Sequence, residues 1–340
     1  MNAEDSPVAP ERSVTWRLIL CAMIGSVHAM QYGWAIGIIN FPAEVISSDL
    51  QIDPKGWAWS GGVVATFCVA GFLGTTFAGS LADSWGRRRL IVLLNLPFLL
   101  AAGLALAAGF LKGTWGYVLL VISRFLVGLA SGAGSVVTPM YLGEIATRST
   151  RGAFSALFQF QITVFILFVQ LASMPSAMST SALWGPCFGI SGVFALVALA
   201  AGPWLVESPS WLMKQKDRYP GQALSALMLL RGISQTDAIE DARALEEAEG
   251  ETDEGDEESS GGGSGEKGKS NIKSLVDILS DSYYRLPLIV LCTLMVTQQF
   301  SGINAIFYYS DGFFKVRGWF VCCCFSVPTL PPHTPATREF

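Results

Sequence analysis

Polar side chains that can donate and accept hydrogen bonds lie inside an apolar stretch near the C-terminal end of this chain. The stretch QQFSGINAIFYYS, residues 298–310, follows the apolar lead-in LPLIVLCTLMVT and contains Gln298, Gln299 and Asn304. In hydrocarbon a stranded polar group is costly, so such residues face a cavity or one another. Amides both donate and accept, and an amide cluster without an intramembrane acid suits a neutral polyhydroxylated ligand better than an ion.

An unbroken helix would point these three amides in different directions. At about 100° per residue, Gln298 and Gln299 are about 100° apart, and Asn304 is about 120° to 140° from either. The pair Ser301-Gly302 lies between them. Such pairs are places where helices kink, and broken helices in mid-membrane present amides and free backbone groups to ligands. We therefore predict a break at Ser301-Gly302.

A second row of polar residues follows the apolar segment 153–174. Gln159, Thr163 and Gln170 fall within about 40° of one another on a helix, whereas Gln161 points the other way. This row predicts a face that meets water or a ligand. The alternative is that the glutamines join neighbouring helices, as polar residues often do in membrane bundles.

Two further polar side chains lie in apolar segments, Arg124 and His28. An intramembrane charge is a functional hypothesis by default, and this applies to Arg124. For His28 we weigh a proton carrier against a hydrogen-bonded packing histidine and favour the latter.

The elements that must position these residues are membrane-spanning helices. The chain is 51% hydrophobic and 14% charged, whereas globular domains carry about 25% charged residues. Apolar runs of about 20 residues with few charges predict spanning helices. They lie at 17–39, 59–82, 90–111, 117–142, 153–174, 184–205 and 286–310. We predict an all-α membrane protein with seven spans.

Small residues recur at intervals of three or four residues and predict close packing between helices. One stripe in the second span consists of Ala70, Gly74, Ala78 and Ala82. The fourth span carries Gly128, Gly132 and Ser135.

Lysine and arginine predict the orientation, because they accumulate in cytosolic loops. Arginines follow the second and fourth spans, whereas the first and third loops carry one lysine each. The residues are Arg87, Arg88, Arg89, Arg148 and Arg151, against Lys55 and Lys112. The N-terminus and residues 206–285 are therefore expected in the cytosol.

We divide the chain into five parts. They are a cytosolic N-terminus (1–16), a six-helix bundle (17–205), a cytosolic linker (206–285), a seventh span (286–311) and a tail (318–340) that does not continue the preceding pattern. Within the linker, GQALSALMLLRG and NIKSLVDILSDSYYR predict short amphipathic helices, and the acidic and Gly/Ser-rich run at about 246–270 predicts disorder.

Five motifs in order resemble the sugar transporters of the major facilitator superfamily, in particular facilitative hexose transporters, over about residues 16–317. They are QYGWAIGIIN, LADSWGRRR, RFLVGLASGAGSVVTPMYLGEIATRSTRGA, VESPSWL and QQFSGINAIFYYS. The resemblance implies the major facilitator fold, with an N-terminal six-helix bundle and the first helix of a second bundle. It also implies alternating access, with a hexose bound between two halves.

The resemblance assigns roles to particular residues. Gln159, Gln298, Gln299 and Asn304 would contact sugar hydroxyls, and Tyr308 and Tyr309 would close an outer gate. A cytosolic salt-bridge network, formed in one state only, would consist of Asp83, Arg87, Arg88, Glu144, Arg151 and Glu207.

Two departures from the family pattern affect the functional prediction. Proton-coupled relatives carry an acid where this chain has Ala35, so Arg124 lacks a titrating partner and facilitated diffusion is favoured over proton symport. The chain also stops after seven spans, so we expect an incomplete copy of a transporter. The alternatives are a sugar/proton symporter, a non-transporting sugar sensor, or a regulatory half-transporter that associates with full-length transporters.

Other functions are not predicted. No catalytic nucleophile with its base, no metal-ligand spacing and no phosphate loop occurs in the sequence. We therefore expect no enzyme, no cofactor, no metal and no nucleic acid partner. The expected partners are a hexose and the lipid bilayer, by default that of the plasma membrane.

Overall fold

All regular structure in the described part of the chain is helical. The computed structural model describes residues 14–53, 56–147, 149–174, 178, 180–215, 219, 221–243 and 282–309. In these residues seven helical segments are long and apolar enough to cross a membrane. Their bounds are Trp16–Gly37, Ala58–Trp85, Arg87–Leu111, Gly113–Ile145, Arg151–Ala172, Trp184–Trp204 and Arg285–Tyr309. The seven predicted spans are confirmed.

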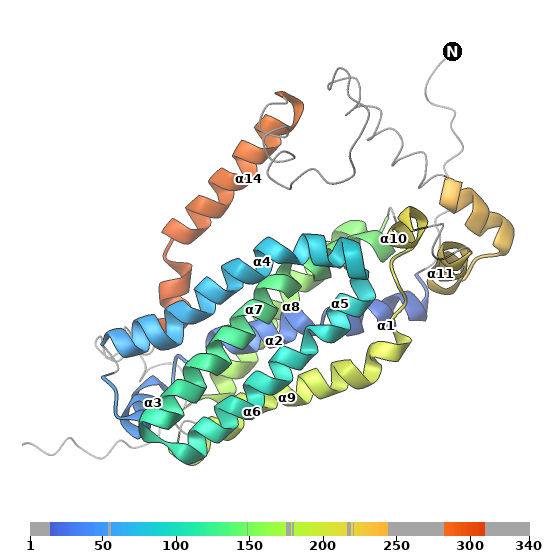
Figure 1. Ribbon diagram of the computed structural model, residues 1–340. Helices are drawn as coiled ribbons and strands as arrows, with labels where there is room; N and C mark the ends of the chain where they lie inside the picture. Colours follow the sequence, from blue (N-terminus) through green and yellow to red (C-terminus); the bar gives the residue numbers. More distant parts are fainter. Residues whose placement is uncertain are drawn as a thin grey trace, which may run out of the picture.

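Several spans consist of two helical pieces. In chain order the elements are α1 (Trp16–Gly25), α2 (Val27–Gly37), α3 (Ala43–Leu50), the π-helical η1 (Ala58–Ala65), α4 (Thr66–Trp85), α5 (Arg87–Leu93), α6 (Asn95–Leu111), α7 (Gly113–Ile145), α8 (Arg151–Ala172), α9 (Trp184–Ala201), the 3₁₀ turn η2 (Gly202–Trp204), α10 (Pro209–Lys214), α11 (Gln222–Arg231) and α14 (Ser282–Phe300). The first six spans form one elongated bundle (Figure 1).

Backbone contact between α4 and α7 holds two spans of the bundle together. A Cβ added at Gly74 of α4 would lie 2.2 Å from the carbonyl oxygen of Leu129, and one at Gly132 of α7 would lie 2.1 Å from that of Gly71. Only glycine permits this approach, which allows dispersion contacts between backbones where lipid offers no hydrophobic driving force. The predicted close packing of these two stripes is confirmed.

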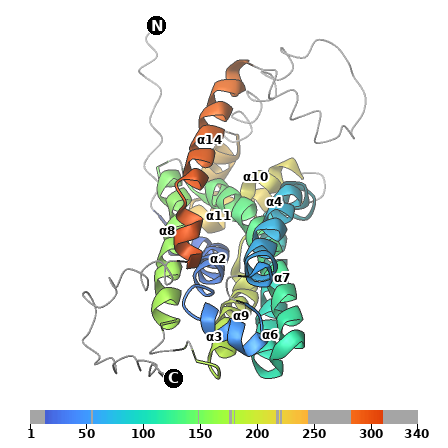
Figure 2. The ribbon, with the colours of Figure 1, turned by 90° about the vertical axis from the view of Figure 1, so that its left-hand side faces the viewer.

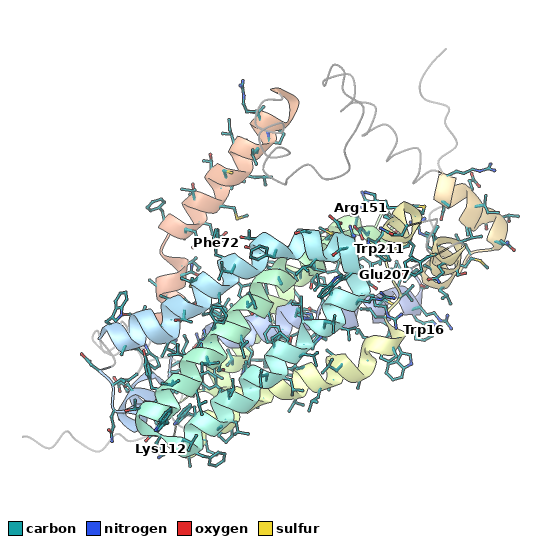
Figure 3. All side chains as sticks on the ribbon, in the orientation of Figure 1. Trp16, Phe72, Lys112, Arg151, Glu207 and Trp211 are labelled. Carbon is teal, nitrogen blue, oxygen red and sulfur yellow. The ribbon has the colours of Figure 1, made fainter. Side chains whose placement is uncertain are left out.

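The last span extends away from the bundle. Figures 1 and 2 show α14 inclined to it and approaching it at the C-terminal end. None of the span's most apolar stretch is buried. Its apolar side chains project on all sides in Figure 3, in contrast to the packed interior of the bundle.

Two short helices, α10 and α11, cover one end of the bundle. Trp16, Glu207 and Trp211 lie at this end and Lys112 at the other (Figure 3). The predicted amphipathic helix in 221–232 is α11, which packs on α10. Helix α11 is joined to the start of α1, because the Thr15 hydroxyl donates to the Leu230 carbonyl oxygen. The acidic run at 246–270 and the tail at 318–340 lie outside the described residues, as does most of the second predicted amphipathic helix.

Candidate functional site

The seventh span breaks where the sequence predicts it to break. Helix α14 ends at Phe300, Ser301 and Gly302 form a turn, and helix resumes at residues 303–309. Gly302 has a φ of 75°, a left-handed conformation that glycine adopts without steric cost. The predicted break is confirmed.

The break brings two of the predicted amides together. Asn304 donates from Nδ2 to Oε1 of Gln299 at 2.6 Å. In an unbroken helix these residues would point about 140° apart. Gln298 is exposed one residue before Gln299. The turn thus gathers amide groups at one place on an otherwise apolar segment.

The polar row of α8 is only partly as predicted. Gln159 and Thr163 lie on the exposed face, whereas Gln161 is buried at 4% exposure on the other side. Gln170 instead accepts a hydrogen bond at 3.1 Å from Asn40, which follows α2. Among the described residues, no hydrogen bond links Gln159 to the amides of the seventh span.

Arg124 is buried in the bundle, and no carboxylate in the described part of the chain pairs with it. It is 1% exposed and donates from Nη1 to the Ala35 carbonyl oxygen at 3.0 Å and from Nε to that of Val63 at 3.3 Å. Its guanidinium carbon lies 4.5 Å from the centre of the Phe67 ring, a cation–π contact. Nη2 has no hydrogen-bond partner among the described residues.

The two tyrosines of the seventh span differ. Tyr308 is 7% exposed and joins the hydrophobic core of the bundle, where Arg124 and Cys68 are neighbours of its hydroxyl. Tyr309 is 38% exposed. Of the two predicted gate residues, only Tyr308 is packed against the first bundle.

His28 is a packing residue, as expected. The hydrogen bond that we also expected for it is not found among the described residues. It is 1% exposed and lies edge-on to Phe98, with ring centroids 5.7 Å apart. Neither ring nitrogen has a partner among the described residues. A nearby buried pair was missed in the sequence, since Gln31 donates to Asn95 at 3.2 Å.

The ionic network at the α11 end has Arg87 at its centre. The side chain of Arg87 is 6% exposed, and Nη2 lies 3.0 Å from Oε1 of Glu144 while Nε donates to Oε2 at 3.1 Å. Nη1 also pairs with Asp83 at 3.1 Å. This two-pronged geometry is the strong form of an Arg–carboxylate pair.

Glu207 belongs to the same end of the bundle but binds backbone groups. Its Oε1 accepts from the backbone N–H groups of Arg88 at 2.9 Å and Ser208 at 3.1 Å. A Cβ at Gly86 would lie 2.5 Å from Oε2, and the φ of Gly86 is 92°. Arg151 is exposed and makes no ion pair with any described residue. The network predicted from the sequence therefore divides into two parts and leaves Arg151 outside.

A polar cluster at the opposite end was missed altogether. The Asp49 carboxylate of α3 accepts from Ser181 at 2.7 Å and Trp184 at 2.9 Å, and lies 3.3 Å from Nζ of Lys112. Burial alone would raise the pKa of Asp49, but the hydrogen bonds and the Lys112 charge lower it below its ordinary value. Asp49 thus ties together three connections that are far apart in the sequence.

The family follows from a comparison of the whole chain with known proteins. The family model described as "Sugar (and other) transporter" matches residues 19–319. The chain belongs to this sugar transporter family. The human protein named solute carrier family 2, facilitated glucose transporter member 4, is 31% identical over 332 residues, covering 91% of this chain and 60% of that protein. Member 3 from Gallus gallus is 31% identical over 325 residues, with 92% and 61% covered.

Solved structures of sugar transporters share the fold. The xylose transporter XylE from E. coli, in a partially occluded inward-open conformation, matches with a TM-score of 0.66 at 20% identity, covering 86% of this chain and 66% of that one. XylE bound to 6-bromo-6-deoxy-D-glucose matches with a TM-score of 0.63. The predicted major facilitator fold is confirmed. This sugar transporter family member spans about 60% of the length of its curated relatives.

Proposed function

We propose that this chain supplies the first bundle and the seventh span of a hexose transporter that works by alternating access and facilitated diffusion. The observation that carries the proposal is the break at Ser301-Gly302, which turns the Asn304 amide onto Gln299 beside the exposed Gln298. Neutral amides can both donate to and accept from sugar hydroxyls. Relatives named as facilitated glucose transporters support a hexose as substrate.

Gln159 and the gate tyrosines complete the proposed site. Gln159 faces outward from α8, where a second bundle would lie. Tyr308 and Tyr309 follow the break by two helical turns and would move with it. The Arg87–Glu144 and Glu207–Arg88 contacts would hold the inner end closed in one state and separate in the other.

The Arg124 environment supports facilitated diffusion over proton symport. Ala35 occupies the place beside Arg124, and it offers only a backbone carbonyl, which does not titrate. Coupling to protons requires a group whose protonation changes during the cycle.

We propose a plasma-membrane protein with the N-terminus and residues 206–285 in the cytosol. Its association with full-length transporters stays a prediction.

Ligand binding to the purified chain tests the proposal directly. D-glucose should raise the unfolding temperature or quench tryptophan fluorescence in a saturable way, and L-glucose should not. A double variant, Gln299→Ala with Asn304→Ala, should lose at least tenfold in affinity, because both amides are removed. Equal responses to the two enantiomers would refute a sugar site on these residues.

A further inference from the structure

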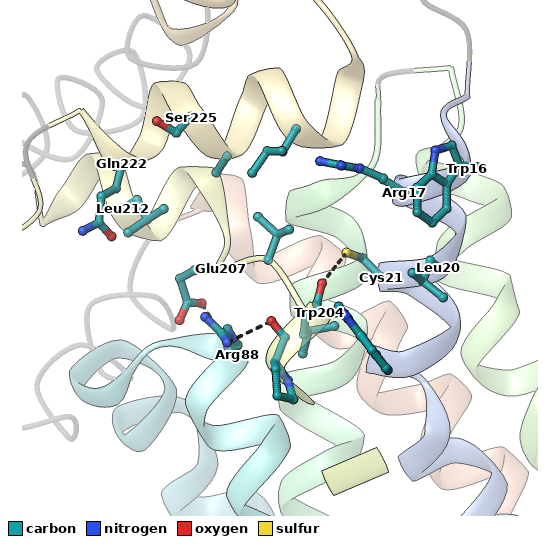
Figure 4. A pocket seen from close by; sticks show the side chains of 15 residues that line it. Trp16, Arg17, Leu20, Cys21, Arg88, Trp204, Glu207, Leu212, Gln222 and Ser225 are labelled. Carbon is teal, nitrogen blue, oxygen red and sulfur yellow. Dashed lines mark hydrogen bonds between the residues drawn. The ribbon is translucent and has the colours of Figure 1, made fainter. Parts of the chain in front are cut away.

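A cavity of about 470 Å³ lies at the α11 end of the bundle, apart from the proposed sugar site. Its walls come from α1, the start of α5, the η2–α10 connection, α10 and α11 (Figure 4). Contacts between the elements of the wall hold this cavity in place. Thr15 at the start of α1 donates to Leu230 of α11, and Cys21 of α1 contacts the carbonyl oxygen of Trp204 at 3.8 Å.

Two arginines face this cavity from different elements. Figure 4 shows Arg17 reaching in from α1 and Arg88 from α5. Arg88 donates from Nη2 to the Pro203 carbonyl oxygen at 3.3 Å, a neutral partner that carries no balancing charge. Among the described residues, neither arginine forms an ion pair with a carboxylate.

The carboxylate of Glu207 offsets only one of the two positive charges in the lining, and it binds backbone N–H groups rather than either guanidinium. Oε1 of Glu207 is held by the backbone N–H groups of Arg88 and Ser208. These N–H groups belong to the starts of α5 and α10, where unpaired backbone donors favour a negative charge. The cavity therefore keeps two cationic, multiply donating groups for a ligand.

The rest of the lining is that of a membrane–water interface. Trp16 begins the first span and Trp204 ends the sixth, and each is 68% exposed. Tryptophan is enriched at the level of lipid headgroups. Leu229 of α11 adds an apolar side chain at 42% exposure. A ligand that fills the cavity must therefore carry a negative charge for the two arginines and an apolar part for the exposed tryptophans and Leu229.

We propose that this cavity binds the phosphate headgroup of an anionic phospholipid, with Arg17 and Arg88 as the phosphate-binding residues and Trp16 and Trp204 flanking its acyl chains. Guanidinium groups bind phosphate oxygens in a two-pronged geometry. An amphiphile satisfies both parts of the lining, whereas free phosphate satisfies only the arginines. The lipid assignment rests on the proposed orientation, in which the α11 end of the bundle lies at the inner leaflet of the membrane. It does not depend on sugar transport.

Native mass spectrometry of the full chain tests this proposal. Phosphatidylserine and phosphatidylcholine with identical acyl chains are titrated into the detergent-solubilised protein, and bound lipid is counted. We expect phosphatidylserine to be retained preferentially and Arg17→Gln to weaken its binding by about fivefold. Arg88→Gln should act in the same direction. Arg89→Gln is the matched control, because Arg89 is exposed on the same helix α5 and does not line the cavity.

Each outcome decides the proposal. Equal retention of the two lipids, or an effect of Arg89→Gln as large as that of Arg17→Gln, would overturn it. A further arm adds inorganic phosphate: displacement of phosphatidylserine at comparable concentration would show a free-anion site and overturn the lipid assignment. Arg17 is exposed, so its replacement leaves the fold intact, and circular dichroism checks this. If lipid selectivity fails while D-glucose binding persists, only this inference is lost.

Discussion

Nη1 of Arg124 donates a hydrogen bond of 3.0 Å to the backbone carbonyl oxygen of Ala35. Residue 35 is therefore next to the guanidinium in space, as the family resemblance implies. No carboxylate of the described residues pairs with Arg124, and this observation underlies the proposed facilitated diffusion. This contact predicts that a side chain introduced at position 35 would interact with the guanidinium of Arg124, which mutagenesis can test.

A carboxylate introduced at position 35 should pair with Arg124. Ala35 is 5% exposed, and a buried carboxylate without a partner is strongly destabilising. In a double-mutant cycle, Ala35→Asp should cost about 3 kcal/mol more in an Arg124→Gln background than in the native chain. Thermal unfolding in detergent measures this, with Ala35→Asn as the uncharged control. Equal costs in the two backgrounds would show that the two side chains do not meet.

The Arg87–Glu144 pair should contribute strongly to the stability of the state described here. Replacing one partner leaves the other largely buried and unpaired, so Arg87→Gln should lower the free energy of unfolding by about 3 kcal/mol. Arg89→Gln is the control, because Arg89 is exposed on the same helix. A cost for Arg87→Gln no larger than for Arg89→Gln would contradict the account.

Asp49 should make stability depend on pH in the acidic range. Its pKa is lower in the folded chain than its ordinary value, which is about 3.9 in an unfolded chain. The unfolded state therefore binds the proton more readily, and the stabilisation is present above about pH 5 and is lost as the pH falls through the folded pKa.

Unfolding temperatures of the native chain and Asp49→Asn measure this effect. The two should differ at pH 7 and converge towards pH 3. Asp237→Asn, at an exposed position, serves as control. A constant difference across the pH range would be inconsistent with the Asp49 assignment.

Gln159 and Gln161 should have separable roles. In a transporter completed with the second bundle of a relative, Gln159→Ala should reduce sugar uptake more than Gln161→Ala, because Gln159 faces outward. Gln161 is buried and contacts Met23, so its replacement should affect unfolding temperature instead. Uptake corrected for the amount of folded protein separates the two effects, and equal losses of uptake would show that α8 faces differently.

Features that depend on neighbouring residues in the sequence were predictable. The spans follow from apolar runs, the break from Ser301-Gly302, and the close approach of a neighbouring backbone to α4 and to α7 from small residues at helical spacing. All three depend on patterns within one segment, where helical geometry converts spacing into position.

Features that depend on distant residues were not predictable. Asp49 and Ser181 are 132 positions apart, and nothing in either loop points to the other. Gln31 likewise donates to Asn95 only after two spans have packed. Arg151 shows the opposite case, since its membership of the ionic network was inferred from a motif and no described residue pairs with it. Helix α3 was missed because it is short and lies in a connection between spans.

The central claim is that this chain carries half of a hexose site that works without protons. Uptake of labelled D-glucose into proteoliposomes, by the chain completed with the second bundle of a facilitated glucose transporter, tests it most directly. We expect saturable D-glucose uptake, exclusion of L-glucose, and the same rate when a protonophore collapses any proton gradient. Uptake that requires the gradient, or that does not distinguish the enantiomers, would contradict it.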